Sequence, residues 1–154
     1  MDLPLSLSKR AKEVLINGTW IANTNFKEQI MSVDWIQANK QISGLNTIAL
    51  LTYHVWYYLQ GLNNVFKGGS LDIKDQYSFD MPKHTSESDW QDLIQQFNCH
   101  AELFVKNIEN LNDNLLSQPF VDEKYGNYLR NIEGVIEHSY YHLGQIVLIK
   151  KIVQ

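Results

Sequence analysis

Hydrophobic residues recur at three- and four-residue intervals in four long segments of the chain, which is the spacing that predicts amphipathic helices. In the first segment the repeat extends from Leu7 to Ile21, and Pro4 suits the first turn of such a helix. The other three segments cover residues 45–66, 90–111 and 125–153. Because no segment alternates convincingly as a strand would, the pattern favours an all-α fold, a four-helix bundle.

Turn-forming residues separate the predicted helices. Ser43-Gly44 is expected to break or cap the chain before the second helix, and Lys67-Gly68-Gly69-Ser70 to stop that helix with glycines suited to a left-handed cap. Ser88-Asp89-Trp90-Gln91 has the pattern of a capping box, which makes Ser88 the expected cap of the third helix. A short helix is also predicted over residues 34–39, and a polar turn over residues 112–119.

The segment between the second and third helices, residues 71–87, has no clear hydrophobic period. A loop this long in a compact domain is usually functional or mobile. We therefore interpret it as a crossover that lies over a pocket. His84 belongs to this loop and is expected to be solvated rather than to bind a metal ion.

Composition and charge argue against nucleic-acid and membrane partners. The 154 residues suffice for one domain, residues 1–154, with a sizeable core. The net charge of −4 and pI of about 5.7 offer no basic stripe for nucleic acid. The sequence also has no apolar stretch of membrane-spanning length, no signal-peptide pattern and a single cysteine, Cys99. These features predict a cytoplasmic protein with no nucleic-acid or membrane partner.

Three histidines carry the candidate chemistry. His138 and His142 are four residues apart in an apolar helical segment, so both rings project from one face and can reach one metal ion. Metalloproteases with the H-E-x-x-H motif share this spacing, but Ser139 stands where their catalytic glutamate would be. His54 lies in the middle of the apolar second helix and is the natural third ligand. The alternative is three histidines hydrogen-bonded within a helical core.

The chain resembles the DinB/YfiT-like superfamily of metal-dependent enzymes over nearly its whole length, and Gly18-Thr19-Trp20-Ile21 and Tyr77-Ser78-Phe79 resemble one uncharacterised branch of it. Three stretches carry most of the resemblance. They are Gly44-Leu45-Asn46-Thr47-Ile48-Ala49-Leu50-Leu51-Thr52-Tyr53-His54, Tyr125-Gly126-Asn127-Tyr128-Leu129-Arg130-Asn131 and Ile136-Glu137-His138-Ser139-Tyr140-Tyr141-His142-Leu143-Gly144-Gln145-Ile146. The resemblance implies that His54, His138 and His142 bind the metal ion and carry the catalysis through it. It also implies that the second and third helices run parallel, joined by a long crossover.

A site of three neutral imidazoles suits Zn²⁺, Ni²⁺ or Fe²⁺, and an open fourth position is typical of catalytic sites. Such a metal could activate water or hold a substrate thiolate. The resemblance implies a thiol transferase or hydrolase acting on a small molecule, with a low-molecular-weight thiol as a possible cofactor, and a homodimer. Four residues could orient ligands or line a pocket: Asn46, Asn131, Tyr141 and Gln145.

Two further hypotheses remain open from the sequence. The bundle could be a non-catalytic metal- or small-molecule-binding protein of a stress response, or its histidine triad could serve only to rigidify the core. Metal affinity with an open coordination position would exclude the purely structural role, and turnover with a thiol would distinguish an enzyme from a binding protein.

Overall fold

The computed structural model describes residues 2–154, which form a helical bundle without a strand. This confirms the predicted all-α fold class. Between α1 and α2 lies a π-helical turn, Glu13–Asn17, and two short 3₁₀ turns cover Asp75–Tyr77 and Glu123–Tyr125. The α-helices are α1 (Leu3–Lys12), α2 (Phe26–Met31), α3 (Trp35–Asn39), α4 (Ile48–Phe66), α5 (Glu87–Glu109), α6 (Asp113–Leu116) and α7 (Tyr128–Val153).

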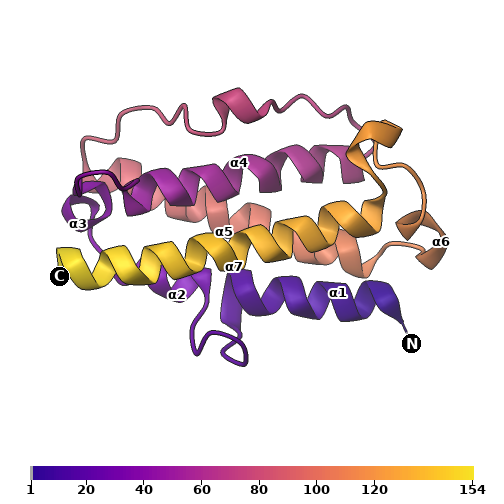
Figure 1. Cartoon of the computed structure of the whole chain (residues 1–154), viewed down its shortest axis with the longest axis horizontal. Coiled ribbons are helices and arrows are strands. Elements are labelled where there is room, and N and C mark those ends of the chain that lie inside the picture. Colours follow the sequence, from indigo (N-terminus) through magenta and orange to yellow (C-terminus); the bar gives the residue numbers. More distant parts are fainter. Residues whose placement is uncertain (1) are drawn as a thin grey trace.

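The four longer helices, α1, α4, α5 and α7, lie side by side along the length of the molecule (Figure 1). Helices α4 and α5 run in one direction, whereas α1 and α7 run in the other. The chain between α4 and α5 returns along the outside of α4, as the predicted crossover requires (Figure 1). Within residues 2–154, no helix is both long and apolar enough to span a membrane.

Large aromatic side chains fill the centre of the bundle. Trp90, Phe26 and Phe97 are fully buried, and the Phe26 and Phe97 rings stack with their centroids 4.8 Å apart. The indole Nε1–H of Trp90 donates a hydrogen bond to the carbonyl oxygen of Val33 over 3.0 Å. Burying a Trp ring with its polar group paired stabilises the core without an unpaired donor. These contacts attach α2 and the turn between α2 and α3 to α5.

Three predicted helix starts are wrong by two or more residues. The last helix, expected from residue 125, begins at Tyr128 as α7, behind the cap Asn127. Helix α4 begins after Thr47, whose hydroxyl accepts from the backbone N–H of Leu50 over 3.1 Å, and not at Leu45 behind a Ser43-Gly44 cap. Helix α5 is capped by Ser86, not by Ser88. Several hydroxyl side chains in each segment could serve as a cap, and only the packed backbone selects one.

The first helix ends earlier than the hydrophobic repeat suggested. The π-helical turn ends at Asn17, because Gly18 adopts an extended backbone with ψ of 160°. Ile21, which continued the repeat, is 64% exposed in the loop that follows. Helix α2 was not predicted; Asn25 caps it by accepting from the N–H of Glu28 over 3.0 Å. The turn predicted over residues 112–119 also contains one helical turn, α6.

The crossover packs against one face of α4, formed by residues 54, 57, 58 and 61. Next to Gly61 lies the side chain of Ile73. The hydroxyl of Tyr57 both accepts from the N–H of Lys74 (2.9 Å) and donates to its carbonyl oxygen (3.0 Å). These contacts recur at the spacing of one helix face, so α4 determines the path of the crossover.

Replacing Gly61 by alanine should destabilise the protein, because the added Cβ would lie 2.6–2.8 Å from three atoms of Ile73. Overpacking of this kind typically costs about 1–3 kcal/mol, and urea denaturation should show the free energy of unfolding reduced by that amount. Gly144→Ala is the matched control, since no atom lies within 4 Å of its added Cβ. It should leave stability unchanged or raise it by up to about 1 kcal/mol. Equal losses in both variants would contradict the packing of the crossover on α4.

Candidate metal centre

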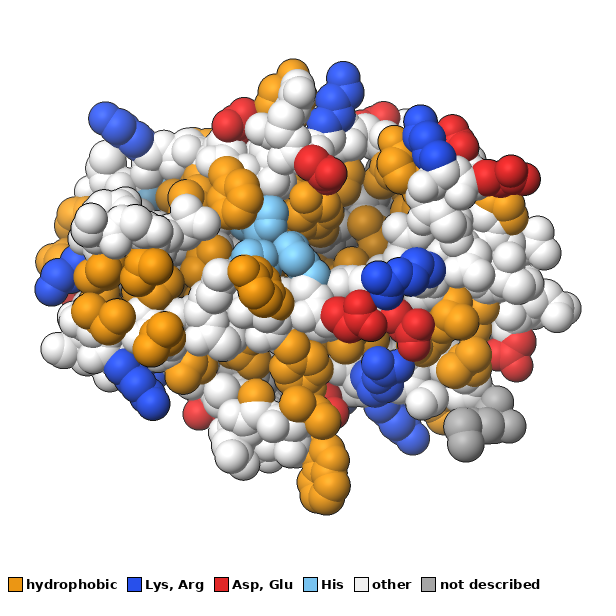
Figure 2. Space-filling model, in the orientation of Figure 1, with side chains coloured by type: hydrophobic (Ala, Val, Ile, Leu, Met, Phe, Trp, Pro, Cys, Tyr) orange, Lys and Arg blue, Asp and Glu red, His pale blue; other side chains and the backbone are white. Residues whose placement is uncertain are grey.

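Three histidine side chains converge in a hollow on one face of the bundle (Figure 2). The Nε2 atom of His138 lies 3.0 Å from Nε2 of His54 and 2.9 Å from Nε2 of His142. One ligand atom from each residue falls within 4.8 Å of the others, so the three residues could hold a metal ion. The predicted triad is therefore assembled in space.

Helices α4 and α7 place these rings. His138 and His142 stand one turn apart on α7, and His54 lies in the middle of α4, which packs beside α7. The buried face of α7 includes Ser139, whose hydroxyl donates back to the carbonyl oxygen of Val135 over 2.7 Å. Ser139 is fully buried and its hydroxyl donates within its own helix, so this residue does not supply the base that the glutamate of H-E-x-x-H enzymes provides.

The outer nitrogens of two histidines have hydrogen-bond acceptors. Nδ1 of His54 donates to the backbone carbonyl oxygen of Ser78 over 3.2 Å, and Nδ1 of His142 donates to Oε1 of Gln145 over 2.6 Å. Because each Nδ1 carries the proton of its neutral ring, Nε2 of both histidines presents a lone pair. Nε2 of His138 can donate a proton to only one of them. The cluster thus has more inward-facing lone pairs than protons, as a cation-binding site requires.

Burial keeps these imidazoles neutral. Removal from water, together with the nearby ring of His142, lowers the pKa of His54 and of His138 to about 4. Burial also lowers the pKa of His142, although its hydrogen bond with Gln145 acts in the opposite direction. At neutral pH the three rings are therefore uncharged, and their Nε2 atoms carry at most one proton among them. The neutral imidazole is the form in which histidine binds metals.

The crossover completes the site with Ser78 and Phe79, which the sequence marked only as part of a stretch resembling one branch of the superfamily and not as site residues. Phe79 stacks on the His54 ring with centroids 3.9 Å apart, and Ser78 supplies the carbonyl oxygen already described. Tyr58 presents its ring edge-on to both His54 and His138, with centroids 5.2 Å away in each case. A backbone carbonyl can belong to any residue type, so no side-chain pattern marks Ser78. The signals for Phe79 were its place in a loop of unusual length and the resemblance of Tyr77-Ser78-Phe79 to one branch of the superfamily.

The four residues considered as supporting groups lie in different surroundings. Gln145 contacts His142 directly. Tyr141 is 65% exposed and presents its ring to His142 at 5.0 Å. Asn131 uses its amide to donate to the carbonyl oxygens of Tyr125 and Asn127, each over 2.8 Å. Asn46 lies with Gln145 along a separate cavity of about 280 Å³.

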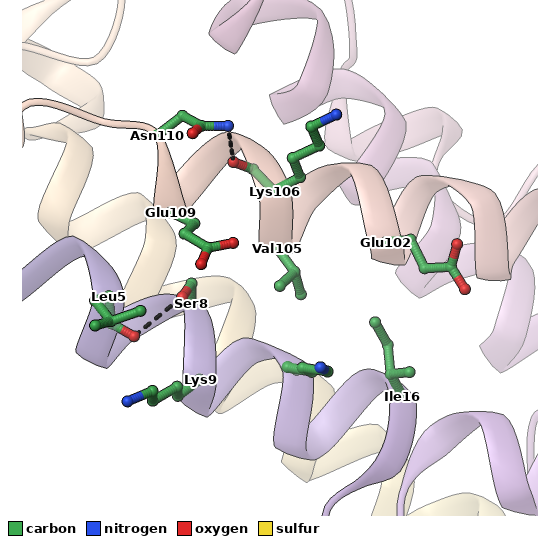
Figure 3. Close-up of a pocket in the computed structure, with 10 residues that line it drawn as sticks. Leu5, Ser8, Lys9, Ile16, Glu102, Val105, Lys106, Glu109 and Asn110 are labelled. Carbon is green, nitrogen blue, oxygen red and sulfur yellow. Dashed lines mark hydrogen bonds between the residues drawn. The ribbon is translucent and has the colours of Figure 1, made fainter.

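A cavity of about 390 Å³ adjoins the triad on the side of His138. Its walls come from α4, from the turn before α7 and from α7 itself: Tyr58, Leu62, Tyr125, Arg130, Asn131, Gly134, Val135 and His138. A larger groove of about 680 Å³ runs between α1 and α5 and contains none of the triad (Figure 3). Its walls mix Lys9, Lys12 and Lys106 with Glu102 and Glu109, and the ammonium groups of Lys9 and Lys106 point away from the groove.

The other two histidines lie outside the triad. His100 packs beside Asn63, whose amide donates to the backbone carbonyl oxygen of His100 over 2.9 Å. His84 is half-buried in the crossover rather than solvated as predicted, and burial lowers its pKa. It lines a separate cavity of about 240 Å³ with Trp56. Neither ring belongs to the candidate metal centre.

Comparison with known proteins places the chain in a family. Residues 29–154 match the family described as "Protein of unknown function (DUF1572)". No curated protein and no solved structure matches the chain. The matched region contains α3 to α7, and therefore all three histidines and the crossover that contacts them. The chain is thus a member of the DUF1572 family.

Proposed function

We propose that this protein is a divalent-metal-dependent enzyme of the DinB-like superfamily that transfers a thiol to, or hydrolyses, a small molecule. The observation that carries the proposal is the convergence of three neutral imidazoles whose inward-facing Nε2 atoms carry at most one proton among them. His54, His138 and His142 are the proposed ligands. The DinB-like character of DUF1572 agrees with the resemblance of the chain to that superfamily.

The ligand set supports a metal with an open position. Three imidazole nitrogens suit Zn²⁺, Ni²⁺ or Fe²⁺, and structural zinc sites are normally closed by four protein ligands. When bound, such a cation would supply Lewis acidity toward a thiol or a water molecule. The chain's own residues orient the ligands: the Ser78 carbonyl holds the His54 ring and Gln145 holds the His142 ring.

Thiol transfer fits the surroundings of the triad better than hydrolysis. The hydrogen-bonding groups described for its rings are a backbone carbonyl and a side-chain amide, and the ring contacts are aromatic. The position of the glutamate base in H-E-x-x-H enzymes is occupied by the fully buried Ser139. A thiol needs less help than water to lose its proton, and the carboxylate of Asp75 near the triad already accepts from the hydroxyl of Tyr58, so these surroundings favour a thiol substrate.

The alternative is a protein that binds a metal or a small molecule without turnover, for instance in a stress response. The cavity beside His138 would serve such binding equally well. For either function we propose a cytoplasmic location and a small-molecule rather than a nucleic-acid partner. The exposed free thiol of Cys99 and the net charge of −4 agree with these choices.

We also propose a homodimer formed through the outer face of α7. Tyr141, Leu148 and Ile152 are 65%, 59% and 51% exposed, and with Gln145 they recur at alternating three- and four-residue spacing. That spacing suits helix-to-helix packing around a two-fold axis. Leu45, 39% exposed, lines the same cavity as Leu148 and widens this apolar face. Figure 2 shows hydrophobic side chains gathered over this end of the molecule.

Single substitutions should remove or weaken metal binding. His138→Ala, His54→Ala and His142→Ala should each abolish stoichiometric Zn²⁺ binding in untagged protein, while the far-UV circular dichroism spectrum stays helical. Gln145→Leu should weaken Zn²⁺ affinity about 10–100-fold, because the His142 ring loses its acceptor. Elemental analysis and chelator competition measure both effects. The control variant His84→Ala should still bind one equivalent of Zn²⁺. If His138→Ala also binds one equivalent of Zn²⁺, the proposed ligand triad is wrong.

Turnover distinguishes the enzyme from the binding protein. Metal-loaded protein incubated with cysteine or glutathione and the electrophile 1-chloro-2,4-dinitrobenzene should consume thiol faster than the same protein treated with a chelator. His142→Ala should lower the rate to that of the chelated sample. Stoichiometric metal binding without thiol consumption across such thiol and electrophile pairs would favour the non-catalytic alternative.

Leu148→Glu should convert the proposed dimer to a monomer, because it places a charge in the apolar face of α7. Analytical ultracentrifugation at several protein concentrations measures the mass. Ile21→Glu alters a comparably exposed residue in the loop before α2 and should leave the mass unchanged. A wild-type protein that sediments as a monomer throughout would refute this interface.

A further inference from the structure

The cavity beside His138 has a basic side chain at its opposite end. Arg130, Gly134 and His138 are four residues apart on α7, and all three line this cavity of about 390 Å³. Residues at this spacing lie on one face of a helix, and eight residues span about 12 Å along its axis. The cavity therefore extends along α7 from an imidazole of the triad to a guanidinium group.

The middle of the cavity is apolar and open. Tyr58, Leu62 and Val135 contribute hydrophobic surface there, and Tyr125 adds a second aromatic ring. Gly134 has no side chain, and a Cβ added at this position would meet no atom within 4 Å. The space above this glycine suits the aliphatic or aromatic body of a small molecule.

The guanidinium of Arg130 is available to a ligand. Its Nη1 donates to Oε2 of Glu137 over 3.0 Å, and the two side chains are 66% and 59% exposed. Exposed ion pairs of this kind contribute little to stability, so a ligand can compete with Glu137 at small cost. The described bond uses Nη1, which leaves Nη2 and Nε as donors for an oxyanion.

Other charged groups make the electrostatic environment differ between the two ends of the cavity. At the end near Arg130, the ammonium of Lys124 lies 4.8 Å from the centre of the Tyr125 ring, although Asp122 partly offsets its charge from 3.5 Å. At the triad end, the carboxylate of Asp75 accepts from the hydroxyl of Tyr58 over 3.0 Å. Asp75 thus disfavours a carboxylate beside Tyr58, whereas Arg130 and Lys124 attract one at the opposite end; a cation held by the triad would attract the thiol end of the ligand instead.

We propose that this cavity selects a small organic acid, with its carboxylate bound by Arg130, its apolar body over Gly134 and its reacting end at the triad. The inference rests on the proposed function, because it names the class of substrate for the same metal centre. Arg130 acts here as a specificity-determining residue. It lies two turns of α7 from the nearest proposed metal ligand, so its removal should not alter metal binding.

A matched pair of ligands tests the proposal on the Zn²⁺-loaded protein. The probes 6-mercaptohexanoate and 6-mercaptohexanol share a thiol and a chain of similar length but differ in the charge of the far end. Isothermal titration should show the acid binding at least tenfold more tightly. In Arg130→Gln that advantage should disappear while the affinity for the alcohol stays unchanged. Gly134→Leu should weaken both ligands by tenfold or more, because its side chain fills the cavity.

Arg10→Gln provides the control for loss of a positive charge. Arg10 also pairs with a glutamate on α7, Glu133, over 3.3 Å, but it does not line the cavity. This variant should keep the full preference for the acid. Equal affinity for acid and alcohol in the wild type, or an equal loss in Arg10→Gln and Arg130→Gln, would overturn the proposal.

Two further measurements distinguish a failure of the proposed metal centre from a failure of the proposed carboxylate site. Zn²⁺ stoichiometry, measured first in every variant, tests the metal centre independently of the acid. If no Zn²⁺ binds, the metal-free protein is titrated with 4-phenylbutyrate and 4-phenylbutanol while amide NMR shifts of α7 are followed. A preference for the acid that depends on Arg130 would then support the anion site alone, and its absence would refute it. Displacement of the acid by inorganic phosphate at lower concentration than by acetate would overturn the assignment to a carboxylate.

Discussion

The pairing of buried imidazoles with hydrogen-bond acceptors is the constraint on which the site depends. His54 is almost fully buried in α4, and the cost of burying its polar ring is offset by the carbonyl oxygen of Ser78. That acceptor comes from the crossover, more than twenty residues later in the chain. The path of the crossover along α4 and the protonation state of the ligand are consequently linked.

The face of α4 that guides the crossover also forms part of the site. Ile73 packs at Gly61, Lys74 pairs with the hydroxyl of Tyr57, and Asp75 pairs with that of Tyr58. By the time the chain reaches Ser78 and Phe79, its position over His54 is set. A long loop without regular structure is thereby ordered by a row of contacts one helical turn apart. The same ordering makes the loop a wall of the metal centre rather than a free surface segment.

Helix α7 contributes to the core, to the triad and to the cavity beside it. Its buried face contributes Ile132, Ile146 and Ile149 to the core, while His138 and His142 stand at the edge of that face. The cavity beside His138 follows the helix toward its N-terminus, which Asn127 caps by accepting from the N–H of Arg130 over 2.8 Å. The amide of Asn131 donates to the carbonyl oxygen of Tyr125. This hydrogen bond holds the preceding turn, and the Tyr125 ring that lines the cavity, against this end of the helix. The rigidity of one long helix thus sets the spacing between the triad and Arg130.

The sequence by itself determined the features that depend on local periodicity. Repeats of apolar residues predicted the long helices, and the four-residue spacing of His138 and His142 predicted that their rings share a face of α7. Tertiary structure decided the features that depend on contacts between distant segments. Which hydroxyl caps α4 or α5, and where Phe79 stacks, follow from the packed backbone. The acceptor of His54 is a main-chain carbonyl, which every residue carries, so only the fold could identify Ser78 as its source.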